Sequence, residues 1–161
     1  MGSKGLLIAL FLMHCFFAKA DESGAVEYND FLICWQDHLE EAILMLGDEV
    51  EKGNEVRAYQ VLDSIRALIV DAKISIKAYE PYNLEYEYQQ AALDWWNFYK
   101  QVFMHEYPEI LKISFHKNLR EKNLKQLSGY LKNIQVAEKF ASHEFKVAQK
   151  RFALKYDLYL E

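Results

Sequence analysis

Apolar residues recur along the chain at alternating spacings of four and three residues. This spacing places them on one face of an α-helix and forms the two-position seam of a coiled-coil heptad. The first seam consists of Tyr28, Leu32, Trp35, Leu39, Ala42 and Leu46. The second seam consists of Ala58, Leu62, Ile65, Ile69, Ala72, Ile76 and Tyr79. Each seam predicts one helix with a buried face.

Two further seams occupy the second half of the chain. The third seam consists of Tyr88, Ala92, Trp95, Tyr99, Val102 and Glu106. The fourth seam consists of Leu127, Leu131, Ile134, Glu138, Ala141, Phe145, Ala148 and Phe152. Four seams in a chain of 161 residues predict one all-α domain, an antiparallel up-down-up-down four-helix bundle.

Helix-breaking residues fall between the seams. Gly53 and Asn54 supply a C-cap and an N-cap between the first two helices, and Pro81 follows the second helix. A polar segment, residues 115–124, precedes the fourth helix. Short connections favour antiparallel packing of helices that follow one another in the sequence.

Pro108 lies inside the third helical pattern. Because Ile110 and Ile113 extend the apolar stripe, we expect the third helix to reach about residue 116 and to be kinked near Pro108. The proline cannot donate the hydrogen bond that a helix needs at this position. The alternative is a break in the helix, with Pro108 starting a new short helix.

The beginning of the chain has the three-part plan of a secretory signal. Lys4 precedes an apolar run over residues 5–17, and Ala20 provides the small residue before the cleavage point. We therefore predict a signal peptide over residues 1–20 and a four-helix domain over residues 21–161. An uncleaved anchor or a buried first helix is the alternative, although the apolar run is too short to span a hydrocarbon core of about 30 Å.

Cys15 suggests a second route to the cell envelope. Bacterial lipoproteins are cut just before a Cys that follows Leu and small residues, and the tetrad here is Leu12, Met13, His14 and Cys15. Leu12 fits that pattern, whereas Met13 and His14 are bulky where small residues are needed. Lipid anchoring at Cys15 is thus an alternative to cleavage after Ala20, and it is the one way in which we expect this protein to contact a membrane.

The composition favours an exported helical domain. The chain is 52% hydrophobic with only 6 Gly and 2 Pro, which favours long helices over a turn-rich β fold. Cys34 is the only cysteine after residue 20, so the domain can form no internal disulfide. The chain also has no N-x-S/T sequon. These features fit a bacterial protein of the periplasm, cell surface or extracellular space better than a eukaryotic secreted cytokine.

Aromatic residues concentrate between Trp95 and Tyr107. Helical spacing directs Trp95 and Tyr99 inward with the seam and leaves Trp96 and Tyr107 at its margin. A core helix is the simplest interpretation of this run. If any ring serves a ligand, Trp96 and Tyr107 are the candidates, because a margin can be reached from outside.

Glu106 occupies a seam position where an apolar residue is expected. One interpretation is a buried acid in a pocket inside the bundle, where Glu106, Tyr107 and Trp96 would bind a small molecule. The other is a structural carboxylate bonded to a Tyr hydroxyl or a basic group, or one that Pro108 has rotated toward water. Glu138 interrupts the fourth seam in the same way.

The chain lacks the motifs of common metal, haem and catalytic sites. Glu-x-x-His, HExxH, CxxCH, GxSxG and a glycine-rich phosphate loop are all missing from the sequence. The sequence therefore predicts no catalytic residue, no metal ligand and no cofactor. A metal or haem protein is a weaker alternative.

Charge is divided unevenly along the chain. Residues 117–156 contain ten Lys and Arg and three acidic residues, whereas residues 21–116 contain seven basic and nineteen acidic residues. A basic ridge opposite the fourth seam repeats every seven residues: Lys125, Lys132, Lys139 and Lys146. It either docks an anionic partner or head group, or it serves solubility and charge balance. The net charge of −5 argues against nucleic-acid binding.

Three segments resemble a family of small, largely uncharacterised bacterial surface proteins that are secreted or lipid-anchored. They are EYNDFL (27–32), ALDWWNFYKQVFMHEYPEILKI (92–113) and AQKRFALKYDLYL (148–160). The resemblance implies an export signal and a helical bundle. It brings no agreed activity and no catalytic residues.

These patterns predict an exported, non-enzymatic protein that acts through binding or structural contacts with an unidentified protein or envelope component. The alternative is the small-molecule pocket near Glu106. A cavity of about 300 Å³ or more beside Glu106 and Trp96 would favour ligand binding. An exposed apolar or basic patch over a filled core would favour contact with a partner.

Overall fold

The structure, a computed structural model, describes residues 24–116 and 120–159. These segments are helical almost throughout and contain no strand, which confirms the predicted all-α fold. The main elements are α2 (Gly24–Glu51), α3 (Glu55–Ala78), α4 (Tyr86–Gln101), a π-helical segment η2 (Val102–Glu106), α5 (Tyr107–Ser114) and α6 (Glu121–Lys155), with a short 3₁₀ turn η1 (Tyr82–Leu84) before α4. The predicted signal peptide over 1–20 and Cys15 lie outside the described residues.

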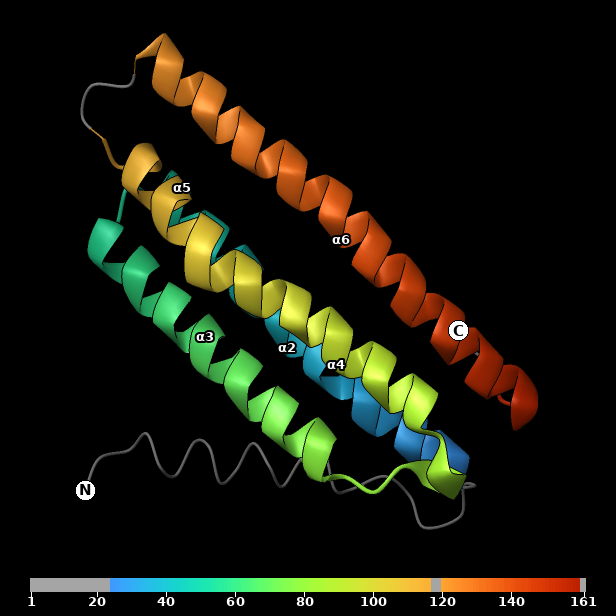
Figure 1. The fold of residues 1–161 in the computed structure, drawn as a ribbon. Coiled ribbons are helices and arrows are strands. Elements are labelled where there is room, and N and C mark those ends of the chain that lie inside the picture. Colours follow the sequence, from blue (N-terminus) through green and yellow to red (C-terminus); the bar gives the residue numbers. More distant parts are fainter. Residues whose placement is uncertain (1–23, 117–119, 160–161) are drawn as a thin grey trace, which may run out of the picture.

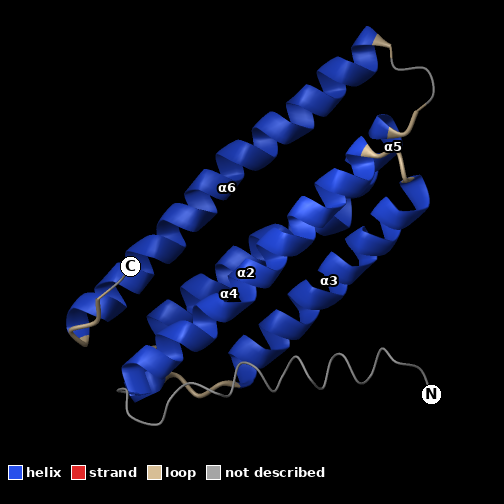
Figure 2. Ribbon diagram, turned by 180° about the vertical axis from the view of Figure 1, so that it is seen from behind, coloured by secondary structure: helices blue, strands red, loops and turns tan. Residues whose placement is uncertain are grey.

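In Figures 1 and 2, the chain reverses direction from α2 to α3, again from α3 to the continuous run of α4, η2 and α5, and again to α6. Hydrogen bonds that join α3 to α4 and η2 also show that these neighbouring helices run in opposite directions. The Gln89 side-chain amide donates to the Ile76 carbonyl over 2.7 Å, and the Arg66 Nε donates to the Phe103 carbonyl over 2.9 Å. Residue numbers fall along α3 as they rise along α4 and η2, so these neighbours are antiparallel.

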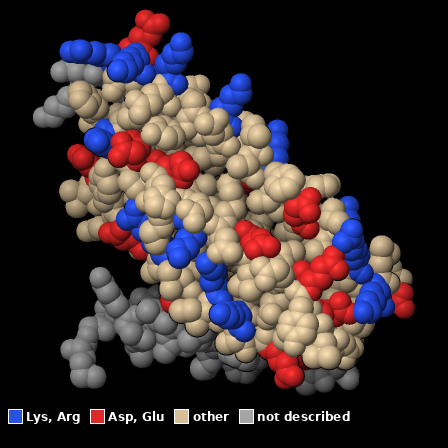
Figure 3. Space-filling view, viewed as in Figure 1, with Lys and Arg blue, Asp and Glu red and all other residues tan. Residues whose placement is uncertain are grey.

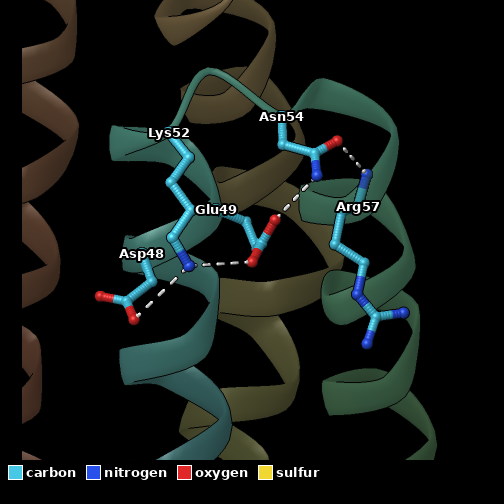
Figure 4. Close-up of polar contacts among 5 residues, drawn as sticks. All are labelled: Asp48, Glu49, Lys52, Asn54 and Arg57. Atoms are coloured by element: carbon cyan, nitrogen blue, oxygen red, sulfur yellow. Dashed lines mark hydrogen bonds and ion pairs between the residues drawn. The ribbon is translucent and has the colours of Figure 1, made fainter.

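The turn between α2 and α3 is built as its residues predict (Figure 4). Gly53 has a φ of 70°, a left-handed conformation in which glycine is not strained. The Asn54 Oδ1 accepts from the Arg57 N–H over 3.3 Å and caps α3, while the Asn54 Nδ2 donates to Glu49 over 3.0 Å. Lys52 also donates to Glu49. Side chains of this kind at an N-cap typically contribute about 1 kcal/mol.

The first three seams form the core. All their residues are buried except Ala42, Tyr79 and Glu106, which are partly exposed. Rings from α2, α4 and α6 meet at one end of this core, where Tyr28 and Tyr88 lie 5.5 and 5.0 Å from Phe152, measured between ring centroids. The aromatic cluster fixes the carboxyl-terminal part of α6 to the body formed by the other helices.

The fourth seam behaves differently along its length. Phe145, Ala148 and Phe152 are buried, whereas Leu131 is 48% exposed and the other seam residues before Phe145 are only partly buried. The expectation that α6 packs along its whole seam is therefore wrong for its amino-terminal half. In Figures 1 and 2, α6 approaches the other helices toward its carboxyl end. The ring cluster holds it there, and the amino-terminal half lies farther from the body.

Pro108 is accommodated by the π-helical segment η2. The Tyr107 N–H bonds to the Val102 carbonyl five residues earlier, and Pro108 then lies in the first turn of α5. Gln101, Glu106 and Tyr107 all keep right-handed helical dihedral angles. The proline therefore changes the hydrogen-bonding pattern, as expected from its missing N–H, while the chain continues as a helix as far as Ser114.

Candidate binding groove

Trp96 does not lie at the margin of a helix. Its relative exposure is 0%, and its Nε1 has no hydrogen-bond partner in the described part of the chain. The predicted placement is wrong because α4 packs against α3 on one side and α6 on the other, so its buried arc is wider than one seam. Trp96 is a core residue.

Tyr107 and Glu106 also lie outside the hollows along α6 that the described residues form. The Tyr107 ring stacks on Phe103, with centroids 4.3 Å apart. Burial raises the pKa of Tyr107, and the Glu138 carboxylate adds to this effect. Glu106 is partly exposed, although its Oε2 is buried without a hydrogen-bond partner among the described residues. Neither residue, nor Trp96, lines the hollows that the described residues form along α6.

A groove runs between α4 and α6, with a volume of about 1090 Å³. Its α4 wall consists of Glu87, Gln90, Ala91, Asp94, Trp95 and Phe98. Its α6 wall consists of Lys132, Asn133, Val136, Ala137, Phe140, Ala141, Glu144, Val147, Ala148 and Arg151. Both sets recur at spacings of three and four residues, so each helix presents one face to the groove. We call this feature the α4–α6 groove.

Ion pairs join the two walls at one end of the α4–α6 groove. Arg151 pairs with Glu87 over 2.6 Å, and Lys155 pairs with Glu85 one turn farther along α6. Tyr156 also donates to Glu85 over 2.8 Å. The hydrogen bonds from Lys155 and Tyr156 hold the pKa of the Glu85 carboxyl below its usual value. These contacts set the distance between α4 and α6 at this end.

Two hydrogen bonds connect α4 to α6 near the middle of α6. The Trp95 Nε1 donates to the Ser142 Oγ over 3.2 Å, and the Tyr99 hydroxyl donates to the Glu138 Oε1 over 3.0 Å. Glu138 thus has the partner that was considered for Glu106, a tyrosine hydroxyl. In the described segments, no ion pair joins α4 to the part of α6 that precedes Glu138.

Large apolar side chains of α6 are exposed at the α4–α6 groove. Phe140 is 69% exposed and Val136 is 63% exposed. They do not belong to the fourth seam, and together with Val147 they form a second apolar stripe at helical spacing. That stripe is the signal in the sequence that indicates the groove. Exposed apolar residues gathered in one place mark an interaction surface.

The basic ridge of Lys125, Lys132, Lys139 and Lys146 is exposed. In the space-filling view, basic side chains follow the outer edge of the molecule along α6, while basic and acidic side chains are mixed over the body (Figure 3). None of the four lysines makes an ion pair within the described segments. Lys132 belongs to both the ridge and the α4–α6 groove.

In segments 24–116 and 120–159, no three or more His, Cys, Asp or Glu side chains gather closely enough to hold a metal ion. None of the helices in these segments combines the length and the apolar character needed to cross a bilayer.

Comparison with known proteins gives no relative. No protein-family model matches the chain, and no curated protein or solved structure matches it either. The resemblance to bacterial surface proteins therefore stays a prediction, and function has to be inferred from the geometry of this chain alone.

Proposed function

We propose that this protein is an exported, non-enzymatic binding protein that holds an amphipathic helix of a partner protein in the α4–α6 groove. The observation that carries the proposal is the pair of facing helical walls, with the exposed Phe140 and Val136 on one wall and the partly buried Phe98 on the other. A helix laid between two such walls buries its own apolar face in the way that helices of a bundle do.

The length and polarity of the α4–α6 groove favour a helix over a small molecule. Its α6 wall runs from Lys132 to Arg151, which corresponds to about 29 Å of helix. Its volume is at the upper limit of about 300–1,000 Å³ that is usual for small-molecule pockets. The polar residues Asp94, Asn133 and Glu144 are distributed along the walls. A partner helix can contact polar residues along the whole groove through the polar flanks beside its apolar face. An amphiphilic small molecule has one polar end, so its pocket would hold polar residues at one end only.

The partner helix is expected to carry acidic residues on one flank. Lys132 lies in the wall without an ion pair in the described segments, and the rest of the basic ridge continues along α6. The partner can be another protein or an envelope component with a helix of this kind. Charge pairing of this type sets orientation and association rate more than affinity.

A displayed library of amphipathic helical peptides of about 20 residues, matched to the groove length, tests this function. We expect selection on the purified protein to enrich peptides with apolar residues at i, i+3, i+4 and i+7. Their binding should weaken at least about tenfold on Phe140→Asp and on Phe98→Asp, because a charge would then face the apolar centre of the interface. Titration by fluorescence anisotropy measures the dissociation constants.

The matched control for the peptide experiment is Leu154→Asp. Leu154 is 81% exposed on the same helix and does not line the α4–α6 groove, so this variant should bind the selected peptides normally. The proposal is wrong if selection enriches no helical peptide, or if the selected peptides bind Phe140→Asp and Leu154→Asp equally well.

Export is part of the proposal and rests on the signal-like segment over residues 1–20. We expect the protein recovered outside the cytoplasm of a bacterial host to begin at Asp21, because small residues precede that position. Mass spectrometry of the mature protein measures this start. An exported protein that retains Met1 would contradict cleavage, and a diacylated Cys15 would replace the soluble form by an anchored one.

A further inference from the structure

A second hollow lies on the opposite face of α6 from the α4–α6 groove. It has a volume of about 410 Å³ and is bounded by α2, α4 and α6. Glu138 and Ser142 of α6 point to it, whereas Phe140 and Glu144, two residues farther along, belong to the groove. We call this hollow the Glu138 pocket.

Two carboxylates and two aromatic rings share the wall of the Glu138 pocket. Glu138 and Glu40 line it together with Trp95 and Tyr99, whose ring centroids are 4.4 Å apart. Leu39, Ile43 and Leu44 make the remainder largely apolar. The three helices thus bring negative charge, aromatic surface and aliphatic surface to one hollow.

Within the described segments, no ion pair balances the negative charge in this pocket. Neither Glu138 nor Glu40 makes an ion pair in the described segments. The one hydrogen bond that Glu138 accepts comes from the Tyr99 hydroxyl, a neutral donor. Burial raises the pKa of Tyr99, and the charge of Glu138 raises it further. The Tyr99 phenol therefore keeps its proton and donates it in the hydrogen bond to Glu138.

This combination selects the chemical class of the ligand. A cation beside aromatic rings is attracted by their π systems, and quaternary ammonium groups are recognised in this way. The apolar walls exclude the water shell that a hydrated metal ion keeps, but they suit the methyl groups of an organic cation. A volume of about 410 Å³ also lies within the usual range for small-molecule pockets.

We propose that the Glu138 pocket binds a small organic cation, with a quaternary ammonium group held against Trp95 and Tyr99 and its charge balanced by Glu138 and Glu40. This site shares Trp95 with the α4–α6 groove but opens on the other face of α6, so its ligand can be tested separately from the partner helix. Balancing the charge of a bound cation would explain why an acidic residue, Glu138, stands in the apolar seam of α6.

Choline is the probe for this site, and its uncharged isostere 3,3-dimethylbutan-1-ol is the matched ligand control. We expect the choline methyl resonance to shift saturably in NMR titrations of the protein, with a dissociation constant of about 1 mM or tighter. The alcohol should bind at least about tenfold more weakly, because it has the same shape and no charge. Equal binding of the two compounds, or no saturation by choline, would overturn the proposal.

Three glutamate-to-glutamine substitutions test whether choline binds in the Glu138 pocket. Glu138→Gln keeps the acceptor for Tyr99 and removes the charge, so choline should bind at least about tenfold more weakly. Glu40→Gln, at an exposed residue of the same pocket, gives a second variant in case the first is poorly folded, and far-UV circular dichroism checks both. Glu144→Gln removes a carboxylate from the opposite face and should leave choline binding unchanged. Equal losses in Glu144→Gln and Glu138→Gln would show that only net charge matters and would exclude a pocket at Glu138.

Discussion

Replacing Trp96 by alanine is expected to lower the free energy of unfolding by about 3–5 kcal/mol. The ring is completely buried, and its removal leaves a cavity in the core. Urea denaturation followed by far-UV circular dichroism measures the change. The expected loss is a large share of the about 5–15 kcal/mol that stabilises a typical domain.

The control for this substitution is Phe140→Ala. Phe140 is an aromatic residue of similar size that is mostly exposed, so its truncation should change stability by about 0.5 kcal/mol or less. If Trp96→Ala costs less than about 1 kcal/mol, the ring is not part of the core, and its earlier assignment to a ligand site becomes relevant again.

The fold is expected to lose stability steeply above pH 10. Burial raises the pKa of Tyr28, Tyr88 and Tyr99 well above the ordinary value of 10.0. In this range the unfolded chain loses its phenolic protons while the native protein keeps them, so stability is full below pH 10 and falls as pH rises. Each such tyrosine contributes about 1.4 kcal/mol per pH unit, and the three together contribute about 4 kcal/mol per unit. Urea midpoints between pH 8 and pH 12 measure the slope.

The Tyr28→Phe variant tests whether buried tyrosines cause this loss of stability. The Tyr28 hydroxyl has no hydrogen-bond partner in the described part of the chain, so its removal breaks no bond. The slope above pH 10 should fall by about 1.4 kcal/mol per pH unit, which corresponds to one proton. Tyr159→Phe, at a fully exposed position, is the control and should not alter the slope. An unchanged slope in Tyr28→Phe would contradict the proposed cause.

The sequence is a good guide to the first three helices because their seams are local patterns. Leu62 and Ile65 are three residues apart and face the same way in any helix, and both are fully buried. The cap at Asn54 is equally local, since its side chain bonds to a backbone group three residues ahead. Such features need no knowledge of which helices pack together.

The errors arise where burial depends on neighbouring helices. Trp96 lies beside the seam of α4 but is completely buried, because α4 packs against both α3 and α6 and its buried arc extends past the seam. Leu131 lies in the seam of α6, but the other helices are too far away to cover it. The sequence pattern gives the direction of each side chain, whereas the distance between helices is a property of the whole domain.

The sequence indicates individual residues of the candidate sites but not the contacts that they make. Glu106 and Glu138 both occupy seam positions where an apolar residue is expected, and the structure places them in different surroundings. Glu138 receives a hydrogen bond from Tyr99 and lines a pocket with Glu40, whereas Glu106 lines no hollow along α6. These contacts join residues far apart in the sequence, so no local pattern reveals them.

The one-sided attachment of α6 has a consequence for the order of folding. A short helix alone in water is marginal, because its first turn is costly to nucleate and only later residues add favourably. The amino-terminal half of α6 has few buried contacts that could offset this cost. Its helix must therefore be nucleated at the anchored end, around Phe152, and propagate backward toward Glu121. The last turns of the molecule to form then lie in the interior of the sequence, far from either terminus.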